Sequence, residues 1–320
     1  MQLVQKVRNI NINKKKVKKF LFGSLDNSGI VAKVLLYVIL IGISFIFLYP
    51  VLQMIVTSFM GLEDLIDPTV MWIPSKILVE NYSKAMEVLK FWDAFWDSVL
   101  LSLLPTICAV VSSALIGYGF AQFEFPLKKL WFASVFIIFL VPSILLSIPT
   151  YVLYSNLGIL NSLAAYIYPA LSGFGLRQPV FIFIFYQFFK MMPKELSESA
   201  EVDGANAVQT FLKIAVPMAI PAIIICTLYS FVWYWNETTL ALSYFNGKYN
   251  TLQMAVSQFE KNYKELFPSG NIGMDSASKS FNEGVLFAGT MLSILPLLVL
   301  YAFTQRWFVE SADRAGIAGN

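Results

Sequence analysis

Six long runs of apolar residues constrain the fold of this chain more than any other feature of its sequence. A helix that crosses a bilayer needs about 20 predominantly apolar residues, and its backbone hydrogen bonds must be satisfied within the segment itself. The six runs that meet this requirement cover residues 31–59, 98–121, 130–153, 162–189, 214–234 and 285–303. The sequence therefore predicts an all-α membrane protein with six transmembrane helices packed as a bundle.

The composition agrees with this prediction and narrows the chemistry that the chain can perform. Apolar residues make up 57% of the chain and charged residues 13%, whereas a soluble domain has about 45–50% and 25%. The net charge of +3 is small, so we expect lipid but no nucleic acid as a partner. The chain has no histidine, which excludes histidine-dependent triads and metal sites. Cys108 and Cys226 lie inside apolar runs and are too few for a zinc site, so we expect neither a metal site nor a catalytic residue.

The first apolar run is preceded by basic residues, as in a secretory signal peptide. It is too long for the apolar region of such a peptide and no small-x-small cleavage pattern follows it, so we interpret it as a transmembrane helix. The predicted organisation is a basic N-terminal segment at 1–30, a first helix at 31–59, an external loop at 60–97, a core domain at 98–303 and a C-terminal tail at 304–320.

The placement of Lys and Arg predicts the orientation of the chain in the membrane. Fourteen of these residues fall in segments on one side of the predicted helices and seven on the other. Because cytoplasmic segments carry the excess of positive charge, we expect both termini in the cytoplasm. The loop at 190–217 is then cytoplasmic, and the segments at 60–97 and 237–284 are external.

The cytoplasmic loop contains a polar stretch, "PKELSESAEVDGANAVQTFLKIAVPMAIPA", which begins at Pro193. Proline suits the first helical position, and Glu195 and Glu198 would complement the helix dipole. Gly204 can end this helix in the left-handed conformation. The sequence thus predicts a helix, a glycine and a second short helix. From the residues alone, a surface that docks into another protein and a solvated connector are both open.

Several residues of this loop resemble the EAA-loop signature of permeases from binding-protein-dependent ABC importers. Glu198, Ser199 and Ala200 are followed by Gly204 and later by a hydrophobic residue and Pro217, with Ser199 where alanine is commonest. The start "PKEL" and the centre "DGA" resemble the carbohydrate, maltose-type branch. Further stretches that resemble this family are "GYGFAQFEFPLKKLWF", "NLGILNS", "YWNETTLAL" and the tail "QRWFVESADRAGIAGN".

The resemblance implies a six-helix, type-1 (MetI-like) importer permease in a bacterial or archaeal cell membrane. It implies a second homologous permease, two ATP-binding subunits and an extracytoplasmic solute-binding protein as partners, with a carbohydrate, such as an oligosaccharide, as solute. The chain has no G-x-x-x-x-G-K-[ST] phosphate-binding loop, so we expect it to bind no cofactor and ATP–Mg to be used by the partner ATPase. The coupling residues implied are Glu198, Ser199, Ala200, Asp203, Gly204, Phe211 and Pro217.

Arg177 and Gln178 are candidates for the solute pathway, because they lie well inside the fourth apolar run. A charge at the centre of a bilayer costs about 2.5–3.5 kcal/mol on insertion scales, so such residues usually face a polar cavity. The alternatives are that the fourth helix starts later in the chain, or that Arg177 pairs structurally with another helix.

Tyr229, Trp233 and Asn236 are further pathway candidates, since they fall near one helix face at i, i+4 and i+7. Aromatic rings can stack on sugars and Asn can donate and accept hydrogen bonds. The alternative is an aromatic belt at the membrane interface.

The long external segments at 60–97 and 237–284 would receive the binding protein or pack over the mouth of the bundle.

Three other functions remain open. One is an importer for an amino acid or an anion. A self-sufficient secondary transporter would call for an internal repeat and carboxylates in mid-span, and a membrane enzyme for clustered catalytic groups. The sequence shows none of these features.

Overall fold

The computed structural model describes residues 23–24, 27–268 and 281–317. The chain divides into two units, Met1–Leu78 and Val79–Asn320, and each is described by itself. Most of the basic N-terminal segment predicted at 1–30 lies outside the described residues. The described part is helical apart from two short strands, which confirms the predicted all-α class.

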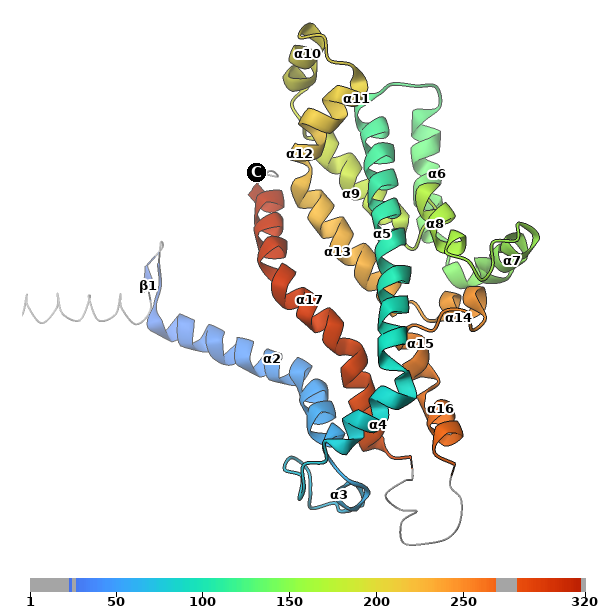
Figure 1. Cartoon of the computed structure of the whole chain (residues 1–320). Coiled ribbons are helices and arrows are strands. Elements are labelled where there is room, and N and C mark those ends of the chain that lie inside the picture. Colours follow the sequence, from blue (N-terminus) through green and yellow to red (C-terminus); the bar gives the residue numbers. More distant parts are fainter. Residues whose placement is uncertain (1–22, 25–26, 269–280, 318–320) are drawn as a thin grey trace, which may run out of the picture. The chain divides into compact units, whose positions relative to one another are not determined.

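The first unit consists mainly of one long helix. Strands β1 (Gly23–Ser24) and β2 (Asn27–Ser28) form an antiparallel pair, and helix α2 (Ile30–Ser58) follows them (Figure 1). Apolar side chains are exposed around most of α2, as expected for a helix that lipid or another subunit covers. This helix confirms the first predicted span, shifted by one residue at each end.

A short closed loop follows α2 within the same unit and contains helix α3 (Leu62–Ile66). The backbone N–H of Leu78 donates to the carbonyl of Phe59 at 2.9 Å, so the two ends of the loop meet. Inside it, the buried carboxylate of Asp64 accepts from the backbone N–H of Ser75 at 3.1 Å. The first part of the predicted external segment is therefore folded on itself.

The second unit is a bundle built around one long helix. Its elements are α4 (Glu80–Leu89), α5 (Phe91–Gln122), α6 (Lys128–Leu140), α7 (Ser143–Asn156), α8 (Ala164–Leu171), α9 (Gln178–Lys190), α10 (Lys194–Val202), α11 (Ala207–Thr210), the π-helical turn η1 (Phe211–Ala215), α12 (Val216–Met218), α13 (Ile220–Asn236), α14 (Thr239–Phe245), α15 (Leu252–Ser257), α16 (Phe259–Leu266) and α17 (Glu283–Ile317). Helix α5 packs against α8, α9 and α13, and α17 packs against α4 and α13.

Small residues allow α5 and α9 to lie close together. A Cβ atom on Gly117 of α5 would lie 2.7 Å from the Cβ of Phe185 and 2.8 Å from the backbone nitrogen of Tyr186, both on α9. No side chain fits at that distance, so glycine is required for this contact. Close approach through small residues is a common way for membrane helices to associate.

Three of the predicted spans are interrupted rather than straight. Among the described residues, α2, α5 and α17 are long and apolar enough to cross a membrane, and the number rises to five if each of two bent helix pairs counts as one span. The third run bends by 105° between α6 and α7, where Pro142 precedes α7. The fifth run bends by 77° before α13, between Pro217 and Pro221. Proline lacks the N–H of the helical ladder and clashes with the preceding turn, which accounts for both positions.

The fourth run is divided into α8 and α9 by a six-residue link at 172–177. Gly173 has φ = +86° in this link, and Pro179 occupies the first turn of α9. Each helix is too short to cross a bilayer alone. The sixth run is longer than predicted, because α17 continues to Ile317 and includes most of the predicted C-terminal tail.

Candidate coupling loop and solute cavity

A structured polar loop, which we call the coupling loop (residues 190–217), lies at one end of the second unit. Helices α10 and α11 form its tip, and α16 lies toward the opposite end of the unit (Figure 1). The predicted arrangement of helix, glycine and second helix is present. Gly204 has φ = +84°, which confirms the predicted left-handed end of the first helix.

Local hydrogen bonds fix the turn at Gly204. The N–H of Gly204 donates to the carbonyl of Glu201 at 3.0 Å, and the N–H of Ala205 donates to the carbonyl of Ala200 at 2.9 Å. This pair of bonds is a Schellman motif, in which glycine satisfies the last carbonyls of a helix. The first half of the loop is therefore a rigid helix with a defined exit direction.

The second half of the coupling loop begins with a capping box that sequence reasoning missed. The backbone N–H of Gln209 donates to Oδ1 of Asn206 at 2.9 Å, and the backbone N–H of Asn206 donates to Oε1 of Gln209 at 2.9 Å. The signal was present in the sequence, because the two side chains stand three residues apart at the start of a helix. The path of the chain from α10 to α11 is thus defined at both helix ends.

The loop presents an exposed mixed surface on its outer side. Glu198, Ser199 and Asp203 are exposed, whereas Ala200 is buried, with 7% of its surface accessible. Val202 is 88% exposed, although it is apolar and lies at the end of a polar helix. Sequence reasoning did not single out Val202. An exposed aliphatic side chain beside carboxylates is suited to contact with another protein.

The chain returns to the bundle through the π-helical turn η1, which follows α11 directly. Phe211 begins this turn, and its ring centroid lies 4.9 Å from that of Tyr118 on α5. Pro217 falls within the apolar run predicted at 214–234, but it is exposed in α12, and α13 begins only at Ile220. The second proline, at position 221, explains this, because it forces the bend between the two helices.

A cavity of about 780 Å³ opens between α7, α8, the link at 172–177, α13 and α14. Its volume is within the range of small-molecule sites, about 300–1,000 Å³. Aromatic and charged side chains give it a mixed lining. They include Tyr154, Tyr166, Arg177, Tyr234, Glu237 and Tyr244. Polar and aromatic groups in one hollow can hold a hydroxyl-rich solute.

Arg177 is exposed and lines this cavity. It precedes α9 in the left-handed conformation, with φ = +50°, so the fourth helix does start later than the apolar run. Its guanidinium carbon lies 5.2 Å from the ring centroid of Trp233, a cation–π contact. The ring of Tyr229 lies 5.8 Å from that of Trp233. The structure thus brings three of the five pathway candidates together.

Gln178 and Asn236 have different surroundings. Gln178 is completely buried, and its amide donates to Ser112 Oγ at 2.6 Å and to the carbonyl of Ala170 at 2.9 Å. It therefore ties the break in the fourth run to α5 and has no surface in the cavity. Asn236 is exposed and donates to the carbonyl of Val232 at 2.9 Å. Its Oδ1 accepts from Gln253 at 3.4 Å.

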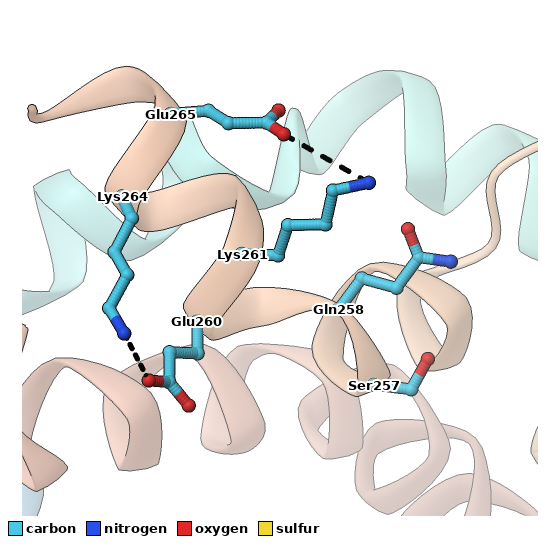
Figure 2. A pocket seen from close by; sticks show the side chains of 6 residues that line it. All are labelled: Ser257, Gln258, Glu260, Lys261, Lys264 and Glu265. Atoms are coloured by element: carbon cyan, nitrogen blue, oxygen red, sulfur yellow. Dashed lines mark hydrogen bonds and ion pairs between the residues drawn. The ribbon is translucent and has the colours of Figure 1, made fainter.

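Helix α16 provides a charged surface in the segment predicted as external. Figure 2 shows Lys264 directed to Glu260 and Lys261 directed to Glu265, with Nζ–Oε1 distances of 2.5 and 3.9 Å. These side chains, with Ser257 and Gln258, line a shallow hollow. The other face of α16 is aromatic, and Tyr263 is buried there. This burial raises the pKa of the Tyr263 phenol, with a smaller contribution from the Glu80 carboxylate.

These features define the class of protein: a helical membrane protein whose bundle has a cavity beside interrupted helices and a structured polar loop at one end. Residues 109–313 match the family model described as "Binding-protein-dependent transport system inner membrane component". The chain therefore belongs to this family of membrane permeases and is a multi-pass membrane protein. Among the described residues, no group of three or more His, Cys, Asp or Glu side chains could hold a metal ion.

Curated relatives align over most of this chain. It is 27% identical to the arabinooligosaccharides transport system permease protein AraQ of Halalkalibacterium halodurans, over 87% of this chain and 93% of the relative. It is 29% identical to the trehalose transport system permease protein SugB of Mycobacterium tuberculosis, over 77% and 84%. It is 27% identical to the diacetylchitobiose uptake system permease protein DasC of Streptomyces coelicolor, over 85% and 92%.

A solved structure shares the fold. A chain of a bacterial ABC transporter involved in the import of the acidic polysaccharide alginate aligns with a TM-score of 0.69. The alignment covers 87% of this chain and 96% of the other, at 18% sequence identity. The bundle with interrupted spans is therefore the fold of an ABC importer subunit.

Proposed function

We propose that this chain is the membrane-spanning subunit of an ATP-driven importer that takes up a carbohydrate, an oligosaccharide in particular. An extracytoplasmic binding protein delivers the solute, and a cytoplasmic ATPase supplies the energy. The observation that carries the proposal is the coupling loop. It is a rigid helix, ended by the Schellman motif at Gly204, that holds an apolar Val202 at 88% exposure beside the carboxylates of Glu198 and Asp203.

The coupling loop serves as the docking site of the ATPase in this proposal. Val202 enters an apolar cleft and Glu198 meets a basic group of the partner. A central apolar anchor with a polar surround is the usual arrangement of residues that dominate an interface. Two ATP-binding subunits and a second permease complete the assembly, because one bundle of this size supplies half of a pathway.

The cavity beside Arg177 is part of the solute path. Arg177 donates hydrogen bonds to solute hydroxyls, and Trp233 holds its guanidinium in place at 5.2 Å. From its first residue, α9 runs 13 residues to the coupling loop, a length of about 20 Å. Arg177 would therefore lie deep in a hydrocarbon layer of about 30 Å. A cation at that depth of the bilayer, with its side chain open to a cavity, is explained by a polar path.

The three relatives support a carbohydrate as the solute, since each is named for the transport of a sugar or an oligosaccharide. Orientation is part of the same proposal: both termini and the coupling loop are cytoplasmic, and α14 to α16 face the binding protein. In Figure 1 the C-terminal end of α17 lies at the end of the unit that carries α12, as this orientation requires.

The test is to purify the chain from its native membrane together with its bound subunits and to reconstitute the complex in vesicles. We expect an ATPase, a second permease and a binding protein, and ATP hydrolysis that rises with oligosaccharide uptake. Stimulation by an amino acid or an inorganic anion instead would overturn the carbohydrate assignment. Uptake without ATP, in vesicles that contain only this chain, would indicate a secondary transporter.

A further inference from the structure

Three aromatic rings join the coupling loop to the membrane bundle. Tyr118 lies near the end of α5, Phe189 near the end of α9, and Phe211 at the start of η1. The ring centroid of Tyr118 lies 4.9 Å from that of Phe211 and 5.3 Å from that of Phe189. Phe211 and Phe189 are 6.2 Å apart. We call these three residues the aromatic joint.

The aromatic joint is densely packed. Tyr118 is 6% exposed and Phe189 is 2% exposed. The side-chain amide of Gln122, one turn beyond Tyr118, donates to the carbonyl of Phe189 at 2.7 Å and ties the ends of α5 and α9 together. Close-packed interiors have low compressibility and transmit displacement. A movement of Phe211 must therefore be accommodated by Tyr118 and Phe189.

The backbone at the joint has an unusual geometry. Phe211 is the first residue of the π-helical turn, which links the capped helix α11 to α12. π-Helical turns are rare and are frequent at functional sites. The bend of 77° before α13 follows after the short helix α12, so the loop enters the fifth run through two irregular steps. Side-chain contact at the aromatic joint is thus a direct route from the loop to α5.

Helix α5 extends from the aromatic joint to Gln178, the neighbour of the cavity-lining residue Arg177. Ser112 lies six residues before Tyr118, about 9 Å along the helix. Its hydroxyl accepts a hydrogen bond from Gln178, which adjoins Arg177. A displacement of α5 at Tyr118 therefore reaches the break in the fourth run through one helix and one hydrogen bond.

We propose that Tyr118 is a positioning residue for energy coupling: it receives the movement of the coupling loop through Phe211 and passes it to α5 and, through Phe189, to α9. This rests on the proposed function, because it assumes that an ATPase moves the loop. Tyr118 is buried and does not line the solute cavity. Its role is to keep loop and bundle moving as one body.

The experiment uses the complete importer complex in vesicles and measures solute transported per ATP hydrolysed. The variants are Tyr118→Ala, Tyr118→Phe, which keeps the ring, and Phe211→Leu, which keeps apolar volume on the loop side. Phe136→Ala is the matched control, since Phe136 is an aromatic residue of α6 whose ring centroid lies 5.2 Å from that of Phe132, and it belongs to neither the joint nor the cavity lining. ATPase co-purification and thermal unfolding are measured for each variant.

We expect Tyr118→Ala to retain the ATPase. We expect it to lower the ratio of solute transported to ATP hydrolysed by about tenfold, within the range for residues that couple two sites. Tyr118→Phe keeps the wild-type ratio, and Phe211→Leu lowers it. The double variant Y118A/F211L lowers the ratio no further than the more severe of the two single changes. Phe136→Ala lowers the unfolding temperature without changing the ratio.

An unchanged ratio in Tyr118→Ala and Phe211→Leu, with only a lower unfolding temperature, would show that the joint is simple packing. The proposed function would then stand. If the wild-type complex itself fails to couple carbohydrate uptake to ATP hydrolysis, the proposed function is wrong and the role of Tyr118 is overturned with it.

Discussion

The side-chain amide of Gln178 donates a hydrogen bond of 2.6 Å to the hydroxyl of Ser112, a residue 66 positions earlier in the chain. The same amide group reaches the carbonyls of Ala109 and Ala170, and its oxygen accepts from the N–H of Gly175 at 2.6 Å. One buried side chain thus satisfies polar groups of α5, α8 and the link at 172–177. The interruption of the fourth run is a defined structure because of this network.

Replacing Gln178 by Leu should destabilise the bundle. The change leaves buried groups such as the N–H of Gly175 without a partner, and each such group costs about 1–3 kcal/mol. We expect a loss of at least about 2 kcal/mol in the free energy of unfolding of the purified complex. Gln187→Leu is the control, because Gln187 is an exposed amide on the same helix. Equal stability of the two variants would contradict this role.

Replacing Val202 by Glu should weaken the association with the ATPase while the fold is kept. Val202 is 88% exposed, so a charge there costs the isolated chain little. Burial of that charge in an apolar cleft would cost about 2 kcal/mol, as for other interface anchors. The measurement is the amount of ATPase that co-purifies. Val202→Leu keeps the apolar character and should retain the partner, and full retention by Val202→Glu would argue against docking at this position.

Gly204→Ala should strain the coupling loop. A Cβ atom at this position would meet no neighbour within 4 Å, so the cost comes only from φ = +84°. The left-handed conformation costs an L-residue about 1–2 kcal/mol. We expect lower ATP-driven uptake with normal amounts of the chain in the membrane. Gly119→Ala on α5 is matched, since its Cβ is also unobstructed and its φ is not in the left-handed region. Uptake that is equally low in both variants would show that the turn is not the cause.

Arg177→Leu should reduce solute uptake by more than any loss in the free energy of unfolding would account for. The variant loses the cation–π contact with Trp233 and the charge in the cavity. Cation–π contacts are worth about 0.5–2 kcal/mol, which corresponds to a change of about 2- to 30-fold. Solute uptake and binding-protein-stimulated ATP hydrolysis are the measurements. Arg177→Lys preserves the charge and should retain part of the activity. Unchanged uptake in Arg177→Leu would remove this residue from the solute path.

Local patterns in the sequence determined much of the architecture. Apolar runs predict helices at all six positions because transfer into lipid depends on local composition and length. The turn at Gly204 was predictable for a similar reason, since only a residue without a Cβ adopts the left-handed conformation readily. The capping box of Asn206 and Gln209 carried an equally local signal that was overlooked.

The tertiary structure alone decided which side chains face the cavity and which are buried. Arg177 and Gln178 are neighbours in an apolar run, and both were candidates for the solute path. One lines the cavity and the other is completely buried, because the partners of Gln178 include residues of α5, more than 60 positions away in the sequence. The contact of Tyr118 with Phe211 likewise joins segments far apart in the sequence. A sequence pattern specifies the face of a helix, but the neighbours of that face depend on how the helices pack.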